Sequence, residues 1–522
     1  MPTMTHHLPR LPVQPARIDA LSLPPRVEAE ASFGDHVENA VFGGLDSVFS
    51  GLSSLGLVRP TVEAGLKVVA SGNDNAWYHA MADHAGTMLE AEYAERGTRK
   101  TYEERVTEYL SEAKAGGRFT AGLNEKTAFH NANFVKELEE VGDAKFVGGN
   151  QVELLIDGPQ SFEKRAELID NAKESIHLLT WTIYDDGTGR DLANRLANRA
   201  REGLDVRVIV DRNIAARGEH IETFKFMEDN GVKLIRWEDP DHVQWGNHCK
   251  MMVVDGVESV AGGMNPGDIY SHAWNVDPDY SGQKWRDTDV YTKGPSVVEQ
   301  EALFVRYWNS QVKLQSLDHA PIGMNRTELL ARAGRPGNSK IAVVDHQPGD
   351  ERYDVYATMM KAVSGATERV EIENAYFLTL PGMNELLHAA LERGVEVRIY
   401  TNSNKSVDEP LVSEPIMKSL PELYKAGAKV FLKKGDTLHS KFMVVDDTFA
   451  SVGSFNLHPR SLYYDSEMAL NIIDESAATK LREQFDNDVS ADKAIEVKSL
   501  KDLEIESTWY NRFIRKYFFR HL

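Results

Sequence analysis

The chain has 522 residues, enough for two or three domains with sizeable cores. Its formal charge is −21, and an acidic surface repels a phosphate backbone, so nucleic acid is disfavoured as a partner. The single cysteine, Cys249, excludes an internal disulfide. The sequence has no run of apolar residues long enough to predict a transmembrane helix. It also lacks the charged start and following apolar segment that would predict a standard secretory signal.

The first 150 residues divide into two segments by composition. Residues 1–35 are rich in proline and lack hydrophobic periodicity, which predicts a disordered arm. Residues 36–150 are predicted to be a helical accessory region, because apolar residues recur at three- and four-residue spacing from Val41 to Leu55. We expect this stripe to pack on the body of the protein, with a helix that dips into a membrane as the alternative.

Residues 151–313 alternate between predicted strands and predicted helices. The strands are expected at 152–156, 175–183, 205–211 and 232–236. This alternation is typical of a mainly parallel sheet with helices on both faces. Residues 266–286, rich in Asp, Tyr, Trp and Gly, are predicted to be an active-site loop, because long irregular loops in compact folds are often functional.

A linker is predicted at 314–338 from its proline and glycine content, and residues 339–490 then repeat the alternation. Strands are expected at 340–345, 369–373, 395–401 and 430–432, followed by a closing helix at 474–487. The predicted fold class is therefore α/β. It comprises two pseudo-symmetric halves, each a mixed sheet flanked by helices, with the helical accessory region at the N-terminus.

Residues 491–522 are predicted to be an amphipathic tail. Trp509, Phe513 and Tyr517 share one face of a helix, and basic residues lie on another face. A basic, aromatic helix in an acidic protein suits an anchor on an anionic membrane surface. The alternative is a helix that docks on the body of the protein.

One motif occurs once in each half: His-x-Lys, four apolar residues, an Asp and, after a glycine, an Asn. Its residues are His248, Lys250, Asp255 and Asn265 in the first half and His439, Lys441, Asp446 and Asn456 in the second. Each residue of the second motif follows its counterpart by the same number of positions. The two halves are therefore an internal repeat.

The residue types of this motif suit phosphoryl chemistry. His and Lys two positions apart point to the same face of a strand, and the Asn amide can donate to an anion. Two such halves facing each other supply fixed positive charge, a nucleophile and an acid. The alternative, two core histidines, does not explain a Lys beside each His in an apolar strand. Symmetry alone leaves open which histidine is the nucleophile.

Both copies resemble the double motif of the phospholipase D superfamily. Further segments are similar to its bacterial cardiolipin synthase branch, namely Trp285-Arg286-Asp287-Thr288-Asp289, Tyr307-Trp308-Asn309-Ser310, and Thr401-Asn402-Ser403 with Asp408. The resemblance covers residues 150–490. It implies that His248 attacks phosphorus, that His439 is the general acid and then base, and that no metal or cofactor is required.

The resemblance also implies roles for the surrounding residues. The two Lys and two Asn of the motifs would hold the non-bridging oxygens of the phosphate. An acid on the strand after each Asn would orient a histidine: Glu467 in the second half and Asp287, with Asp289 as the alternative, in the first. Asp255 and Asp446 are expected to be structural rather than chemical.

The expected function is that of a phosphatidyltransferase of the cardiolipin synthase type, with a phospholipid substrate and a lipid alcohol such as phosphatidylglycerol as acceptor. One alternative is a phospholipase D in which water resolves the intermediate. The other is a nucleic-acid phosphodiesterase, which the charge disfavours. We expect a cytoplasmic protein, peripheral at the membrane, with export by a non-standard route as an alternative. The motifs specify no oligomeric state.

Overall fold

The computed structural model describes residues 127–215, 221–239, 245–350, 352–378, 380 and 382–505. The predicted arm at 1–35 and the helical stripe from Val41 to Leu55 lie outside the described residues. The proposed membrane contacts Trp509, Phe513 and Tyr517 lie outside them too.

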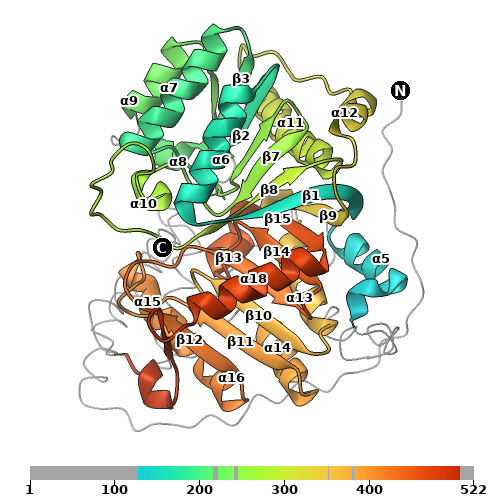
Figure 1. The fold of residues 1–522 in the computed structure, drawn as a ribbon, viewed down its shortest axis with the longest axis vertical. Helices are drawn as coiled ribbons and strands as arrows, with labels where there is room; N and C mark the ends of the chain where they lie inside the picture. The colour runs from blue at the N-terminus through green and yellow to red at the C-terminus, as the bar shows by residue number, and fades with distance from the viewer. Residues whose placement is uncertain are drawn as a thin grey trace, which may run out of the picture.

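The first half is a mixed sheet with helices on both faces (Figure 1). The three strands farthest from the second half are parallel to one another, and the strands nearer the second half are antiparallel, so the sheet is mixed and not mainly parallel as the alternation predicted. The strands are β1 (Val147–Ile156), β2 (Ser175–Leu179), β3 (Asp205–Asp211), β4 (Lys233–Trp237), β6 (Met251–Val254), β7 (Glu258–Gly262) and β8 (Thr288–Lys293). The helices are α6 (Asp157–Asn171), α7 (Gly187–Arg201), α8 (Arg212–Ala215), α9 (Ile221–Asp229), α10 (Asp268–Ser271) and α11 (Ser296–Leu314).

The second half repeats this arrangement. Its strands are β9 (Ser339–His346), β10 (Arg369–Asn374), β11 (Glu396–Thr401), β12 (Lys429–Lys433), β13 (Lys441–Val445), β14 (Phe449–Gly453) and β15 (Asp465–Ile473). Its helices are α13 (Asp354–Ser364), α14 (Met383–Glu392), α15 (Pro410–Ser419), α16 (Pro421–Lys425), α17 (Pro459–Tyr463) and α18 (Glu475–Asp488). The short 3-10 helix η3 (Pro348–Asp350) follows β9.

The two halves join in one continuous sheet, because β1 and β9 pair in antiparallel fashion at the seam. Read outward from the seam, the strand order is β1-β8-β7-β6-β2-β3-β4 in one half and β9-β15-β14-β13-β10-β11-β12 in the other. The orders are equivalent, as the internal repeat predicts. Helix α11 of the first half packs on β9, and α18 of the second half packs on β1, so each half covers part of the other.

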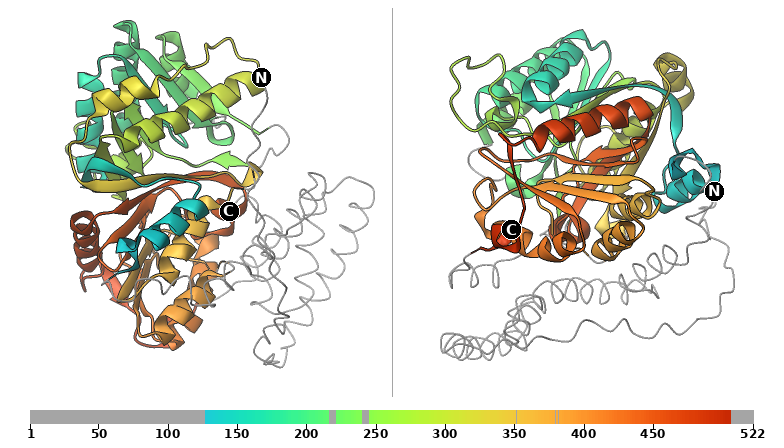
Figure 2. Two further views of the ribbon diagram at one scale, coloured as in Figure 1. Left: turned by 90° about the vertical axis from the view of Figure 1, so that its right-hand side faces the viewer. Right: turned by 60° about the horizontal axis from the view of Figure 1, so that its bottom comes forward.

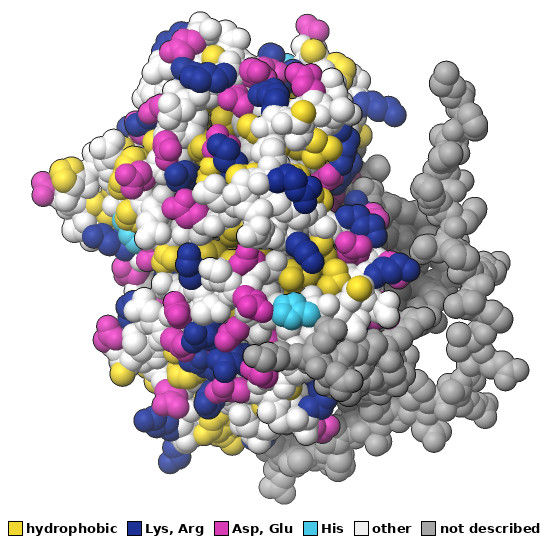
Figure 3. Space-filling model, turned by 45° about the vertical axis from the view of Figure 1, so that its right-hand side comes forward, with side chains coloured by type: hydrophobic (Ala, Val, Ile, Leu, Met, Phe, Trp, Pro, Cys, Tyr) yellow, Lys and Arg dark blue, Asp and Glu magenta, His cyan; other side chains and the backbone are white. Residues whose placement is uncertain are grey.

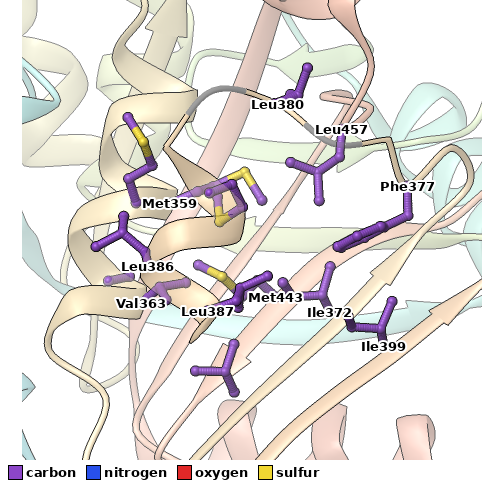
Figure 4. Close-up of a cluster of buried hydrophobic side chains, with 14 of the residues drawn as sticks. Met359, Val363, Ile372, Phe377, Leu380, Leu386, Leu387, Ile399, Met443 and Leu457 are labelled. Carbon is purple, nitrogen blue, oxygen red and sulfur yellow. The ribbon is translucent and has the colours of Figure 1, made fainter. Parts of the chain in front are cut away.

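Four apolar clusters stabilise the described part of the chain, the smallest of which comprises Phe162, Met264, Tyr270 and Trp285. The outer face of each half has its own cluster. Figure 4 shows part of that of the second half, in which Leu387 and Met443 lie between Val363 of α13 and Ile372 of β10. The third cluster lies under α11 and α18 and includes Trp308 and Phe485. The left view of Figure 2 shows α18 on one side of the second half and the other helices on the opposite side. Burial of strands on both faces explains their nearly continuous apolar sequences.

The element boundaries differ from the predicted segments at three places. Strand β1 begins at Val147, inside the predicted accessory region, and η1 (Ala128–His130) with α5 (Ala132–Val141) buries Phe129 and Phe134 in the core of the second half. The predicted linker contains α12 (Arg326–Ala333). Strand β16 (Ala494–Glu496) pairs with β12, and η4 (Leu500–Leu503) follows it, so the sheet extends into the predicted tail. These boundaries depend on strand pairing and burial between distant segments, which a local sequence pattern does not reveal.

None of the described helices is both long enough and apolar enough to cross a membrane. On the face shown in Figure 3, Lys and Arg side chains are interspersed with Asp and Glu.

Candidate active site

The two His-x-Lys motifs lie at equivalent positions, immediately before the central strands β6 and β13. A short parallel pairing places each motif beside the last strand of the other half: β5 (Gly246–Asn247) pairs with β15, and Leu438 pairs with Arg286. The His248 amide donates to the Ser466 carbonyl and the His439 amide to the Arg286 carbonyl, both at 2.8 Å. The backbone therefore brings both motifs to the seam.

Each histidine is oriented by a carboxylate from the opposite half. Nδ1 of His248 lies 3.0 Å from Oε1 of Glu467, and Nδ1 of His439 lies 2.7 Å from Oδ2 of Asp287. The sequence placed one such acid in each half, and the structure shows that the pairing crosses the seam. Asp289 has another role, because its Oδ2 accepts hydrogen bonds from Ser161 at 2.5 Å and Arg165 at 2.9 Å. In both pairs the Nε2 atom of the histidine is left for chemistry.

The Lys and Asn side chains of the motifs lie beside the histidines. Lys250 is buried and donates to the His248 carbonyl at 2.6 Å, and Nζ of Lys441 lies 2.9 Å from Nδ1 of His439. The Asn265 amide donates to the Tyr270 hydroxyl at 3.1 Å. Oδ1 of Asn456 is buried and has no hydrogen-bond partner within the described residues. The seam therefore gathers two imidazoles, two ammonium groups and two amides.

Burial sets the protonation of this cluster. It lowers the pKa of both histidines well below the ordinary value of 6.5, and the neighbouring lysines lower it further. Burial also lowers the pKa of Lys250 to about 7 and that of Lys441 to about 8, and raises that of Glu467 to about 7. A bound phosphodiester anion would favour the charged form of both lysines.

The glycine before the first Asn makes room for a carboxylate. A Cβ atom on Gly263 would lie 2.2 Å from Oδ1 of Asp287, closer than any side chain tolerates. Gly263 therefore allows close approach of the acid that orients His439.

The loop at 266–286 lies against the site, as its composition predicts. It contains α10, at the edge of the first half that faces the second (Figure 1). The Tyr270 ring meets His439 edge-on with centroids 5.0 Å apart, and the Trp285 ring stacks on it at 5.3 Å. The Tyr270 hydroxyl is 3.5 Å from Nε2 of His439. Two aromatic rings therefore pack against the imidazole of His439.

Sequence reasoning missed Ser461, the counterpart of Tyr270 in the second half. Both residues follow the motif Asn by the same spacing, and each lies on a short helix, α10 or α17. The Ser461 hydroxyl donates to Oε1 of Glu467 at 2.6 Å. Comparing the two repeats at this offset would have identified it.

Asp255 and Asp446 lie away from the histidines, at the turns that follow β6 and β13. Asp255 accepts hydrogen bonds from the amides of residues 173–175, and Asp446 from those of residues 367–369. Both have positive φ, 53° and 52°. Each carboxylate therefore binds the backbone that leads into a neighbouring strand, β2 or β10.

Comparisons with known proteins agree with this geometry. A family model described as "Cardiolipin synthase, PLD-like domain" matches residues 166–274 and 359–489, which include both motifs. The major cardiolipin synthase of Bacillus subtilis is 28% identical over 379 residues, covering 70% of this chain and 74% of that one. The cardiolipin synthase of Listeria welshimeri is 29% identical over 350 residues, covering 65% and 69%.

Among solved structures, the phosphatidylserine synthase of Haemophilus influenzae has a similar fold. Its TM-score is 0.58 at 16% identity, and the match covers 74% of this chain and 98% of that one. At this identity the likeness concerns the fold. It supports an architecture of two joined halves with a shared sheet.

Proposed function

Because this chain belongs to the phospholipase D superfamily, in its cardiolipin synthase branch, we propose that it is a phosphatidyltransferase that transfers a phosphatidyl group through a phosphohistidine to a lipid alcohol such as phosphatidylglycerol. The observation that carries this proposal is the crossed pairing of the partly buried His248 with Glu467 and of the buried His439 with Asp287, beside two buried lysines. Such a site holds a nucleophile and an acid on either side of a phosphate.

In the first step, Nε2 of neutral His248 attacks phosphorus. The N–P bond forms and the P–O bond to the leaving alcohol breaks. His439, protonated once the bound phosphodiester anion offsets the effect of burial on its pKa, donates its Nε2 proton to the departing oxygen. Glu467, on Nδ1 of His248, stabilises the positive charge that develops on the ring. Asp287 does the same for the protonated form of His439.

In the second step, the hydroxyl of the acceptor lipid attacks the phosphohistidine. His439 takes the hydroxyl proton, the new P–O bond forms, and the N–P bond breaks to free His248. Lys250 and Lys441, with the amides of Asn265 and Asn456, hold the non-bridging oxygens through both steps. Asp255 and Asp446 have no part in the chemistry, because they bind backbone amides elsewhere.

The choice between a lipid alcohol and water depends on how the site is covered. Water is abundant in any open site, so transfer requires a pocket that excludes it and aligns the acceptor hydroxyl. Tyr270 and Trp285 cover His439, the residue that takes the acceptor's proton. This arrangement favours transfer over hydrolysis. The enzyme would act from the cytoplasmic side as a peripheral protein on anionic membranes.

The test is product analysis with purified protein and vesicles that contain phosphatidylglycerol. We expect cardiolipin in excess of phosphatidic acid. Phosphatidic acid and free head group as the only products would identify a phospholipase D. Turnover of a single-stranded oligonucleotide without turnover of any lipid would identify a nucleic-acid phosphodiesterase and refute the proposal.

A further inference from the structure

Arg286 is a buried arginine at the seam that the proposed chemistry does not use. It comes from the first half, and its guanidinium meets two acids of the second half. Nε donates to Oδ2 of Asp488 in α18 at 2.7 Å, and Nη2 lies 3.4 Å from Oε1 of Glu373 in β10. Nη1 lies 3.5 Å from Asp157 of its own half. Arg286 therefore ties the last strand of the first half to two elements of the second.

The same residue contacts both partners of the His439–Asp287 pair. Its Nη1 donates to the Asp287 carbonyl and, at 2.8 Å, to Oγ1 of Thr288. Its own carbonyl accepts from the amides of His439 at 2.8 Å and Ser440 at 3.1 Å. Arg286 thus binds the backbone of Asp287 through its side chain and the backbone of His439 through its own main chain.

The other half lacks this arrangement. The counterpart of Arg286 is Ser466, whose carbonyl accepts from the His248 amide but whose side chain is short. There Glu467 is held within its own half by the Ser461 hydroxyl. Of the two histidine–carboxylate pairs, only His439–Asp287 is therefore joined to an ion pair that spans the seam within the described residues.

We propose that Arg286 is a positioning residue for His439, which fixes Asp287 by anchoring it across the seam to Asp488 and Glu373. The consequence for turnover rests on the proposed function of His439, whereas the placement of Asp287 does not. A planar guanidinium can hold Asp488, the Asp287 carbonyl and Thr288 at once, and a lysine ammonium cannot match this fork. Arg286→Lys keeps the charge and loses the geometry.

The molecule supplies a matched control in Arg398. This arginine also pairs with an acid of α18 and a glutamate of β10, namely Asp486 at 2.6 Å and Glu371 at 2.9 Å. Its contacts within the described residues, which also include the rings of Phe431 and Phe485, involve neither His439 nor Asp287. Arg398→Lys therefore makes the same chemical change in a similar but more exposed ion-pair network, which lies within the second half and does not touch the site. Asp488→Asn and Asp486→Asn form a second, milder pair in case a lysine at 286 prevents folding.

The experiment measures kcat and KM on a soluble phosphodiester, thermal unfolding, and the Nδ1 resonance of His439 by histidine-selective ¹⁵N NMR. That resonance is assigned by its loss in His439→Ala. We expect Arg286→Lys to lower kcat by about 10-fold or more, by analogy with the loss of groups that orient metal-bound histidines. We also expect it to move the His439 resonance, with KM little changed. Arg398→Lys should change kcat less than about 2-fold and leave the resonance in place.

Equal effects of the two lysine variants on kcat and on the His439 resonance would overturn the proposal, and so would an unmoved resonance in both Arg286→Lys and Asp488→Asn. If the unmodified protein turns over no phosphodiester, the proposed function fails. The NMR comparison still decides whether Arg286 positions Asp287.

Discussion

The two histidines have the same kind of partner but different surroundings. His439 lies beside the rings of Tyr270 and Trp285, and Arg286 holds the backbone of its partner Asp287. The Trp181 ring centroid lies 6.0 Å from that of His248, and the carboxylate of its partner Glu467 accepts a hydrogen bond from Ser461. The repeat therefore duplicated the reacting groups, while their supports diverged. Divergence of this kind is expected where two histidines perform different steps.

Removing either histidine should have the largest effect. We expect His248→Ala and His439→Ala each to abolish turnover with the fold retained, because nucleophile and acid act in one site. Rapid-quench labelling should trap phosphate on His248. A phosphoenzyme on His439 would reverse the roles. Recovery of activity on mixing the two variants would refute a site built within one chain.

The crossed pairing predicts which histidine each acid serves. Asp287→Asn and Glu467→Gln should each lower kcat by roughly 10- to 100-fold, as other histidine-orienting groups do. Asp287→Asn should leave less of His439 protonated, so a substrate with a p-nitrophenolate leaving group, which needs no proton, should recover most of the loss in kcat/KM, which reports the first step. Glu467→Gln should show no such recovery. The opposite pattern would mean that the crossed pairs do not operate in turnover.

The pH dependence should reveal the buried lysines. Burial lowers the pKa of Lys250 to about 7 and that of Lys441 to about 8, so their positive charge is lost as pH rises through this range. We expect kcat/KM to fall above pH 7 to 8. The limb in kcat should lie at higher pH, because a bound phosphate anion favours the ammonium form. Lys441→Arg keeps its charge, so it should remove one of the two ionisations from the fall in kcat/KM. A kcat/KM that stays constant up to pH 9 would contradict the assignment.

The smallest effect on chemistry is expected at the two motif aspartates. Asp446→Asn retains a residue that tolerates positive φ but weakens the bonds from the amides of residues 367–369. The free energy of unfolding, measured with urea, should fall by about 1–3 kcal/mol. Asp255→Asn, at a more exposed site, should cost less. Loss of kcat per folded molecule at unchanged stability would instead give these residues a chemical role.

Much of this architecture could be predicted because it depends on local patterns. The strands before and after each motif follow from apolar, β-prone sequence, and the repeat predicts two equivalent halves. The extent of each half was harder to predict. Phe129 and Phe134 belong to the core of the second half although they precede the first in sequence, because burial and not chain order decides where an apolar side chain lies.

The reacting groups could be read from the sequence: a repeated His, Lys and Asn at the ends of apolar strands, with an acid after each Asn. Only the tertiary structure decided how they pair. His248 and Glu467 are 219 residues apart and His439 and Asp287 are 152 apart, yet each pair is in hydrogen-bond contact. Each acid also has a histidine of its own half closer along the chain. The parallel pairing of each motif with the last strand of the opposite half sets the partner, since a hydrogen bond depends on distance in space and strand pairing fixes that distance.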